Sequence, residues 1–194
     1  MPPGERVIVL GASGVVGQVA AQAARLHGAG LVVAVSRSAE GVSVAAERGA
    51  DATVQLRDGE DAADLAARMR EVVGGEVDLV VDPLCGIPAT SAITVLGEGG
   101  RLVNLGSSAG ATAEFSSVFV RARSIDLRGY TNNSLTTEQR RTVLGTVLED
   151  AAAGELTVSQ DVVDWPNGPA AWGRQARGEL TRRAVIRVSD RPGA

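Results

Sequence analysis

The stretch RVIVLGASGVVGQVAAQAARL, residues 6–26, joins a short apolar run, a glycine-rich turn and an alanine-rich helical pattern. Residues 7–10 are four consecutive apolar residues, which is typical of a strand buried on both faces of a sheet. Residues 11–17 carry glycine at their first, fourth and seventh positions. Apolar residues then recur at the spacing of an amphipathic helix. The stretch therefore predicts a strand, a tight turn and a helix in direct succession.

The turn fits the pattern A-x-G-x-x-G on Ala12, Gly14 and Gly17. In such a turn Gly14 would let the backbone approach a pyrophosphate closely, and Gly17 would let the helix pack tightly on the sheet. The helix N-terminus would offer N–H groups and a partial positive charge to the phosphates. The alternative is a tight turn that holds no ligand. We expect a dinucleotide site that uses the turn residues Ala12, Ser13, Gly14, Val15, Val16 and Gly17.

Strand-like and helical segments alternate along the first two thirds of the chain. We expect further strands at 31–35, 52–56, 77–84, 101–107 and 124–131, and helices at 42–49, 58–75, 88–100 and 136–154. This alternation predicts an α/β, Rossmann-type doubly wound parallel sheet of about six strands with helices on both faces. Residues 107–117 have the composition of a loop. Three strand-like pieces follow, at 158–165, around 169–179 and at 182–188, and they suggest no further repeat.

Residue types that are absent or rare in the sequence exclude several kinds of catalysis. All 19 basic residues are arginine, and His27, Tyr130 and Cys85 are the single members of their types. Without lysine, a phosphate-loop ATPase and a Schiff-base enzyme are excluded. A catalytic triad would have to use His27, and a Cys/His zinc site would have one ligand of each type, so we expect no metal site and assign no catalytic residue. A cofactor must supply any chemistry.

Charge and hydropathy indicate the cellular setting. The net charge of -4 gives no basic footprint for nucleic acid or an anionic membrane. No apolar run approaches the roughly 20 residues that span a bilayer. We expect a soluble cytoplasmic protein that acts on a small-molecule substrate. Asp82 and Cys85, at the end of the fourth strand, are interpreted as buried structural residues rather than as an acid–base group and a nucleophile.

The end of the second strand indicates which dinucleotide binds. NAD-binding units usually carry Asp or Glu there, to accept hydrogen bonds from the ribose hydroxyls. This chain has Ser36, Arg37 and Ser38 instead. An arginine flanked by hydroxyls would bind a 2′-phosphate through charge-assisted hydrogen bonds. The residues favour NADP, although a solvated surface arginine is the alternative.

Five segments, in order and spacing, resemble the nucleotide-binding half of medium-chain dehydrogenases/reductases, in the zinc-independent quinone oxidoreductase and enoyl reductase branch. They are GERVIVLGASGVVG, ERGADATVQLRD, VDLVVDPLCG, GEGGRLVNLGSSAG and SIDLRGY. The resemblance implies a Rossmann domain that binds NADPH and passes hydride to a quinone or an activated double bond. It implies that Ser36, Arg37 and Ser38 meet the 2′-phosphate. It also implies that Asn104, Leu105 and Gly106 line the nicotinamide side, with Gly129 and Tyr130 nearby.

The chain departs from this family at two positions and lacks one of its domains. The closing strand of the family, G-K-V-V, is read here as RRAVI, residues 182–186. The family often has lysine where Gly41 stands, which would leave Arg37 to act alone. Family members also begin with a GroES-like catalytic domain that has no counterpart here. We therefore expect a Rossmann domain at 1–154 and a segment at 155–194 that returns to the missing domain. A non-catalytic NADP-binding redox sensor is the alternative, whereas a short-chain reductase is disfavoured because Ser134 stands where its lysine would follow Tyr130.

The segment 124–131 comes last among the repeated units, which predicts an edge strand. Edge strands leave N–H and C=O groups unpaired and recruit other strands. The resemblance implies a homodimer in which two such edges pair about a twofold axis. The alternative is that the charged side chains of Arg123, Asp126 and Arg128 prevent pairing.

Overall fold

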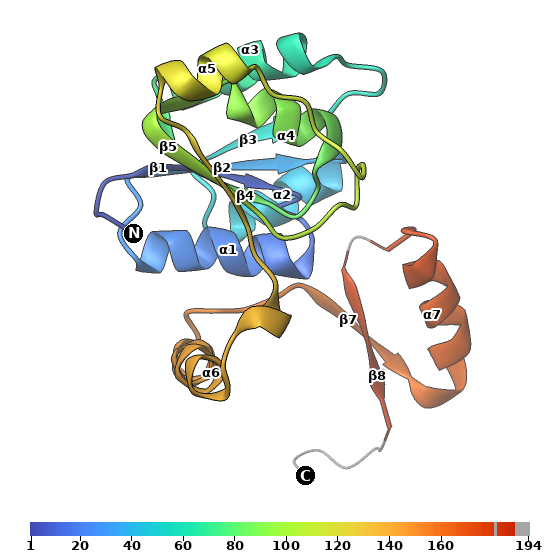
Figure 1. The fold of residues 1–194 in the computed structure, drawn as a ribbon. Coiled ribbons are helices and arrows are strands. Elements are labelled where there is room, and N and C mark those ends of the chain that lie inside the picture. The colour runs from blue at the N-terminus through green and yellow to red at the C-terminus, as the bar shows by residue number, and fades with distance from the viewer. Residues whose placement is uncertain (181, 189–194) are drawn as a thin grey trace.

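A computed structural model describes residues 1–180 and 182–188 (Figure 1). Residues 181 and 189–194, part of the expected 155–194 segment, lie outside the described residues. The strands are β1 (Arg6–Leu10), β2 (Leu31–Ser36), β3 (Ala52–Gln55), β4 (Val77–Asp82), β5 (Leu96–Asn104), β6 (Asp126–Gly129), β7 (Gln160–Asp164) and β8 (Arg183–Arg187). The α-helices are α1 (Val15–Leu26), α2 (Ala39–Glu47), α3 (Ala62–Val73), α4 (Gly86–Ile93), α5 (Ser117–Ala122), α6 (Thr137–Ala152) and α7 (Gly168–Ala176).

Strands β1 to β6 form one parallel sheet in the order β3-β2-β1-β4-β5-β6. The chain builds outward from β1 to β3 and then returns to the other side of β1 to place β4, β5 and β6. The predicted six-stranded, doubly wound Rossmann-type sheet is thus confirmed. Strand β6 lies at one edge, as its place in the sequence predicts.

Two apolar layers cover the sheet because successive residues of each strand face opposite sides. In β1, Ile8 and Leu10 belong to the layer beneath α3 and α4, whereas Val7 and Val9 pack with α1 and α2. Figure 1 shows α1 on one side of the sheet and α3, α4 and α5 on the other. Small residues such as Ala21 and Ala24 let α1 approach the strands closely.

The prediction of a helix at 88–100 is wrong for the second half of that range. Helix α4 ends at Ile93, and β5 already begins at Leu96. In the β4–β5 ladder, Val77 pairs with Leu96 but Leu79 pairs with Arg101, so β5 bulges through the intervening residues. Gly99 has a φ of +67°, which a glycine adopts without steric cost. The three glycines at 97–100, which were placed at the end of the predicted helix, instead belong to a bulge in β5.

Two further expectations for the second half of the chain need correction. Residues 117–122, for which no element was predicted, form α5, with Ser116 as its N-cap. The piece around 169–179, expected to be strand-like, contains α7, which connects the parallel strands β7 and β8. The tail therefore does contain one more strand–helix–strand unit, which lies beside the main sheet (Figure 1). None of the helices in residues 1–180 and 182–188 is long and apolar enough to cross a membrane.

Candidate functional site

The carboxyl edge of the sheet is the candidate site. The strand order reverses at β1, so the loops after β1 and β4 separate toward opposite faces there. Ligands of open α/β sheets bind in the crevice at such a switch point. The chain places its glycine turn, the end of β2 and the loops after β4 and β5 at this edge.

Two backbone hydrogen bonds hold the turn after β1, one to β2 and one within the turn. Ala12 N–H donates to the Val35 carbonyl at 3.0 Å, and Gly14 N–H donates to the Gly11 carbonyl at 3.0 Å. Helix α1 then begins at Val15, and Gly14 is an N-cap without a side chain to satisfy the first N–H groups. The N–H groups of Val15, Val16 and Gly17 have no acceptor within the helix, as at any helix start. They are the groups that an anion would meet.

Gly17 and Gly14 are glycine for different reasons. A Cβ on Gly17 would lie 2.4 Å from the Gly11 carbonyl oxygen and 2.5 Å from Ala12 Cα, so close packing of α1 requires glycine there. The predicted packing role of Gly17 is confirmed. Gly14 is exposed, has a φ of -72°, and its Cβ would meet only the Gly11 oxygen at 3.4 Å. The fold itself would accept a side chain at Gly14.

Of the three residues predicted to bind the 2′-phosphate at the end of β2, Ser36 and Ser38 make contacts within the chain, whereas Arg37 is exposed. Ser36 is 2% exposed, and its hydroxyl lies 2.9 Å from the Ser13 hydroxyl, so it joins β2 to the glycine turn. Ser38 is the N-cap of α2 and accepts from Gly41 N–H at 3.0 Å. Arg37, between them, is exposed. Contact of all three residues with a 2′-phosphate stays a prediction.

Gly41 stands where the resembled family often has lysine, and the space around it is crowded. A Cβ at this position would lie 2.2 Å from Ser36 Oγ and 2.9 Å from Ser13 Cβ. Gly41 is buried within α2, directly against the two paired serines. The Ser13–Ser36 contact and a side chain at position 41 thus compete for the same space.

Asp82 organises the loops after β4 and β5. It is 1% exposed, which confirms its interpretation as a buried residue at a strand end. Its Oδ1 accepts from the N–H groups of Leu84 and Cys85 at 2.9 and 2.8 Å. Its Oδ2 accepts from Asn104 Nδ2 at 2.7 Å. A buried carboxylate with three donors is well satisfied, and here it ties one loop to the other.

The backbone of Cys85 is in a strained conformation. Its φ of 57° and ψ of -156° fall in a region that almost only glycine occupies. The carboxylate of Asp82, which accepts from the Cys85 N–H, holds this conformation. Cys85 is half-buried rather than part of the core, so its interpretation as a core residue is only partly right.

The remaining predicted residues meet at the end of β5 and β6. Asn104 pairs with Gly129 across the two strands, and its carbonyl accepts from Tyr130 N–H at 2.9 Å. The Asn104 side chain also donates to the Gly106 carbonyl at 2.9 Å, and Leu105 N–H donates to the Asp82 carbonyl at 2.8 Å. Tyr130 is 43% exposed. The structure thus brings Asn104, Leu105, Gly106, Gly129 and Tyr130 to one edge, next to the loop after β4.

Sequence patterns gave no sign of one residue that contacts the turn. Gln18, in the second turn of α1, is 1% exposed, and its Nε2 donates to the Ser13 carbonyl at 2.7 Å. Its other partner, Ser159, is 141 residues away, and no local spacing connects them. Nothing in the sequence pattern distinguishes Gln18 from Gln22, one turn later on the same helix.

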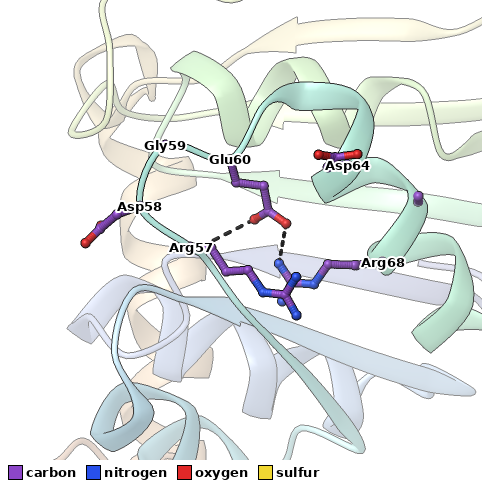
Figure 2. Close-up of a pocket in the computed structure, with 7 residues that line it drawn as sticks. Arg57, Asp58, Gly59, Glu60, Asp64 and Arg68 are labelled. Carbon is purple, nitrogen blue, oxygen red and sulfur yellow. Dashed lines mark hydrogen bonds and ion pairs between the residues drawn. The ribbon is translucent and has the colours of Figure 1, made fainter.

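A separate hollow of about 480 Å³ lies between the loop after β3 and α3 (Figure 2). Glu60 lies at its centre, accepts from Arg57 N–H at 3.3 Å and pairs with Arg68 at 2.5 Å. Figure 2 shows these polar groups turned toward one another. Strand β3 is two strands away from β1, so this hollow is distinct from the switch point. At its centre, Glu60 and Arg68 neutralise each other.

Within the described part of the chain, no group of three or more His, Cys, Asp or Glu side chains is placed to hold a metal ion.

Comparison with solved structures finds the same fold in several proteins. The chain is 27% identical to AibC, with a TM-score of 0.78, and the match covers 96% of this chain and 49% of that one. It is 21% identical to a mycobacterial quinone oxidoreductase, with a TM-score of 0.82 and coverage of 96% and 57%. It is 20% identical to mycobacterial Rv1454c complexed with NADPH, with a TM-score of 0.80 and coverage of 96% and 57%. The chain thus spans about half the length of these proteins.

A comparison with curated proteins finds no match. The family model of zinc-binding dehydrogenases, in contrast, matches residues 15–149, more than half of the chain. The matched range runs from the start of α1 nearly to the end of α6 and includes the loops after β2, β4 and β5. The fold and this match agree, and the chain belongs to the zinc-binding dehydrogenase family, in the nucleotide-binding half that it shares with other medium-chain dehydrogenases/reductases.

Proposed function

We propose that this chain is the NADPH-binding domain of an oxidoreductase. The observation that carries the proposal is the contrast between two glycines of the turn. Gly17 is required by packing within the chain, whereas the fold leaves room for a side chain at Gly14. Gly14 is the N-cap of α1, and it lies at the switch point of the sheet. Because the fold does not require glycine there, we infer that glycine serves the close approach of a pyrophosphate to the backbone. The NADPH complex of mycobacterial Rv1454c, which has the same fold, supports a nicotinamide cofactor.

The choice of NADPH over NADH rests on Arg37. In NAD-binding units a carboxylate at the end of the second strand accepts from both ribose hydroxyls and would repel a 2′-phosphate. Here Ser36 ends β2, and Arg37 and Ser38 follow, so no carboxylate stands at this point. The exposed Arg37 guanidinium and the Ser38 hydroxyl would bind the phosphate oxygens.

Wild-type protein is expected to bind NADPH at least about tenfold more tightly than NADH, since one charge-assisted contact contributes ~1.5–3 kcal/mol. Isothermal titration calorimetry with both dinucleotides measures the ratio. Arg37→Ala should weaken NADPH binding and leave NADH nearly unchanged. Arg57→Ala, an exposed arginine after β3, provides a charge-matched control for a general loss of positive charge. Equal affinities of the wild type for the two dinucleotides would contradict the assignment of Arg37.

The reaction that we propose is hydride transfer to a quinone, an enone or a similar activated double bond, without zinc. Bound NADPH supplies the hydride from its nicotinamide ring. The chain's own residues bind the phosphates at the turn and orient the ring against the segment Asn104–Gly106 and against Gly129 and Tyr130. The likeness to a mycobacterial quinone oxidoreductase supports this class of substrate.

This chain by itself is expected to oxidise NADPH slowly in the presence of a quinone, well below about 10 per second, a typical enzymatic rate. It spans about half the length of its structural relatives, and shielding of the hydride path from water would need residues from the rest. Loss of NADPH absorbance, compared with a protein-free mixture, measures the rate. Tight binding with no quinone-dependent oxidation would favour the alternative, a non-catalytic NADP-binding redox sensor. Ordinary turnover would show that this chain suffices.

We propose a homodimer in which two β6 edges pair. Strand β6 is an edge strand, and Leu127 is 39% exposed on it. Asp126 and Arg128 pair with each other at 2.6 Å, which lowers the net charge that this edge presents to a second strand. Light scattering should give twice the chain mass for wild type and a lower mass for Leu127→Pro, with circular dichroism to check that the variant is folded. A wild-type monomer would refute the pairing, and a folded variant that stays dimeric would place the interface elsewhere.

A further inference from the structure

A buried glutamine joins the glycine turn to a distant part of the chain. Gln18 Nε2 donates to the Ser13 carbonyl at 2.7 Å, and Gln18 Oε1 accepts from Ser159 N–H at 2.7 Å. A carbonyl can only accept and an N–H can only donate, so these two partners fix which way the amide faces. With 1% of Gln18 exposed, water has almost no access to replace either bond.

The bond to Ser13 controls one peptide plane of the turn. The Ser13 carbonyl and the Gly14 N–H are the two ends of the same planar peptide group. The N–H end donates to the Gly11 carbonyl at 3.0 Å, and the carbonyl end accepts from Gln18. Both ends are thus held. If this peptide rotated, its carbonyl oxygen would turn toward the N-terminus of α1, where it would repel an anion that the N–H groups attract.

The segment 157–159, between α6 and β7, is anchored without Gln18. Thr157 N–H donates to Gln22 Oε1 at 3.0 Å, and Gln22 Nε2 donates to the Thr157 carbonyl at 2.8 Å. Arg48, just after α2, donates to the Thr157 hydroxyl and to Ser159 Oγ, the latter at 3.4 Å. Ser159 is 5% exposed. It therefore presents its N–H to Gln18 from a fixed position on α1 and α2.

We propose that Gln18 is a positioning residue for the phosphates of the dinucleotide, and that the 157–159 segment acts through it as an outer layer of the cofactor site. Gln18 touches no ligand in this proposal. It keeps the Ser13–Gly14 peptide oriented so that only N–H groups face the phosphates. The role in binding rests on the proposed function, whereas the control of the peptide plane does not.

The test compares two glutamines on the same helix. Gln18→Met keeps nearly the same side-chain size and removes both hydrogen bonds. Gln22→Met removes three hydrogen bonds to Thr157 and one to the backbone carbonyl of Gln18, but none to the turn, so it is the matched control for loosening the segment. NMR amide exchange without ligand is the first readout. Gly14 N–H should exchange at least about tenfold faster in Gln18→Met, the rate expected if about 1.4 kcal/mol of protection is lost, and remain unchanged in Gln22→Met.

Calorimetric titration with NADPH is the second readout. Gln18→Met should weaken binding at least about tenfold and Gln22→Met by less than about twofold, even where both lower the melting temperature. Equal weakening in both variants would overturn the proposal, because the effect would then come from the segment alone. Unchanged exchange at Gly14 in Gln18→Met would also overturn it, whatever the affinity.

A third outcome separates this proposal from the proposed function. Wild type that binds neither NADPH nor NADH would refute the proposed function and the role of Gln18 in binding together. The Gly14 exchange rate would still decide whether Gln18 orients the peptide. Should Gln18→Met fail to fold, Gln18→Asn keeps a neutral amide but is one methylene group shorter, so it cannot reach both Ser13 and Ser159. Faster Gly14 exchange in this variant would then support the orienting role, and unchanged exchange would overturn it.

Discussion

Gly14→Ala is expected to bind NADPH about a hundredfold more weakly than wild type while unfolding at nearly the same temperature. The protein itself tolerates a methyl group here, because the nearest atom to a Cβ is the Gly11 oxygen at 3.4 Å. A pyrophosphate in close contact with the backbone would not. Forcing a methyl group into a packed contact costs about 1–3 kcal/mol, and about 2.7 kcal/mol corresponds to a hundredfold in Kd. Calorimetric titration and a thermal melt measure the two quantities.

The separation of binding from stability is what makes this variant informative. Alanine at an N-cap costs helix stability by no more than about 1 kcal/mol relative to glycine. Gly145→Ala, in α6, is the control, because a Cβ there meets nothing within 4 Å. It should change neither affinity nor fold. Wild-type affinity in Gly14→Ala would show that no phosphate approaches this residue, and would remove the main support for the proposed function.

Gly17→Ala is expected to lower the free energy of unfolding by about 3 kcal/mol or more. The added Cβ would lie 2.4 Å from the Gly11 carbonyl oxygen and 2.5 Å from Ala12 Cα. These are backbone atoms of the turn that links β1 to α1, so the clash cannot be relieved by rotating a side chain. Helix α1 would have to move away from the sheet. For a chain of this size, the melting temperature should fall by about 6–12 °C.

Gly145→Ala again provides the comparison, since it makes the same chemical change inside a helix with free space. Alanine is favoured over glycine in a helix by about 0.5–1 kcal/mol, so this variant should melt at the wild-type temperature or slightly above it. A Gly17→Ala protein that melts as wild type does would show that α1 packs less closely on the turn than the structure has it.

The type of sheet and the edge position of β6 were predictable from the sequence because they depend on local patterns and on the order of the repeated units. The four apolar residues of β1 and the three glycines after it determine a strand, a turn and a helix within 21 residues. Repetition of that pattern leaves few topologies other than a doubly wound parallel sheet. Residues after the carboxyl ends of parallel strands lie at one edge of the sheet, and Arg37, Asn104 and Tyr130 are found there. The roles of Asn104 and Tyr130 at the nicotinamide were predicted from the family resemblance alone.

The errors arose where tertiary contacts override local preference. Residues 97–100 hold three glycines and read as the end of a helix, yet strand pairing with β4 draws them into β5 as a bulge. Helix α5 has six residues, among them two valines and a phenylalanine that favour strands. Helix α7 is stabilised by packing on β7 and β8, which no spacing within it shows. Gln18 depends on Ser159, whose position only the folded chain defines.

The crowding around Gly41 limits which substitutions this chain can accept at that position. A lysine at position 41 would add a second positive charge near Arg37, but its Cβ would overlap Ser36 Oγ at 2.2 Å. A lysine there would require the Ser36 hydroxyl to leave its contact with Ser13, by rotation or by substitution, and Ser13 Cβ, 2.9 Å from the added Cβ, to shift. Either change weakens the tie between β2 and the turn. Positions 13, 36 and 41 are therefore coupled, so the effect of a substitution at one of them depends on the residues at the other two.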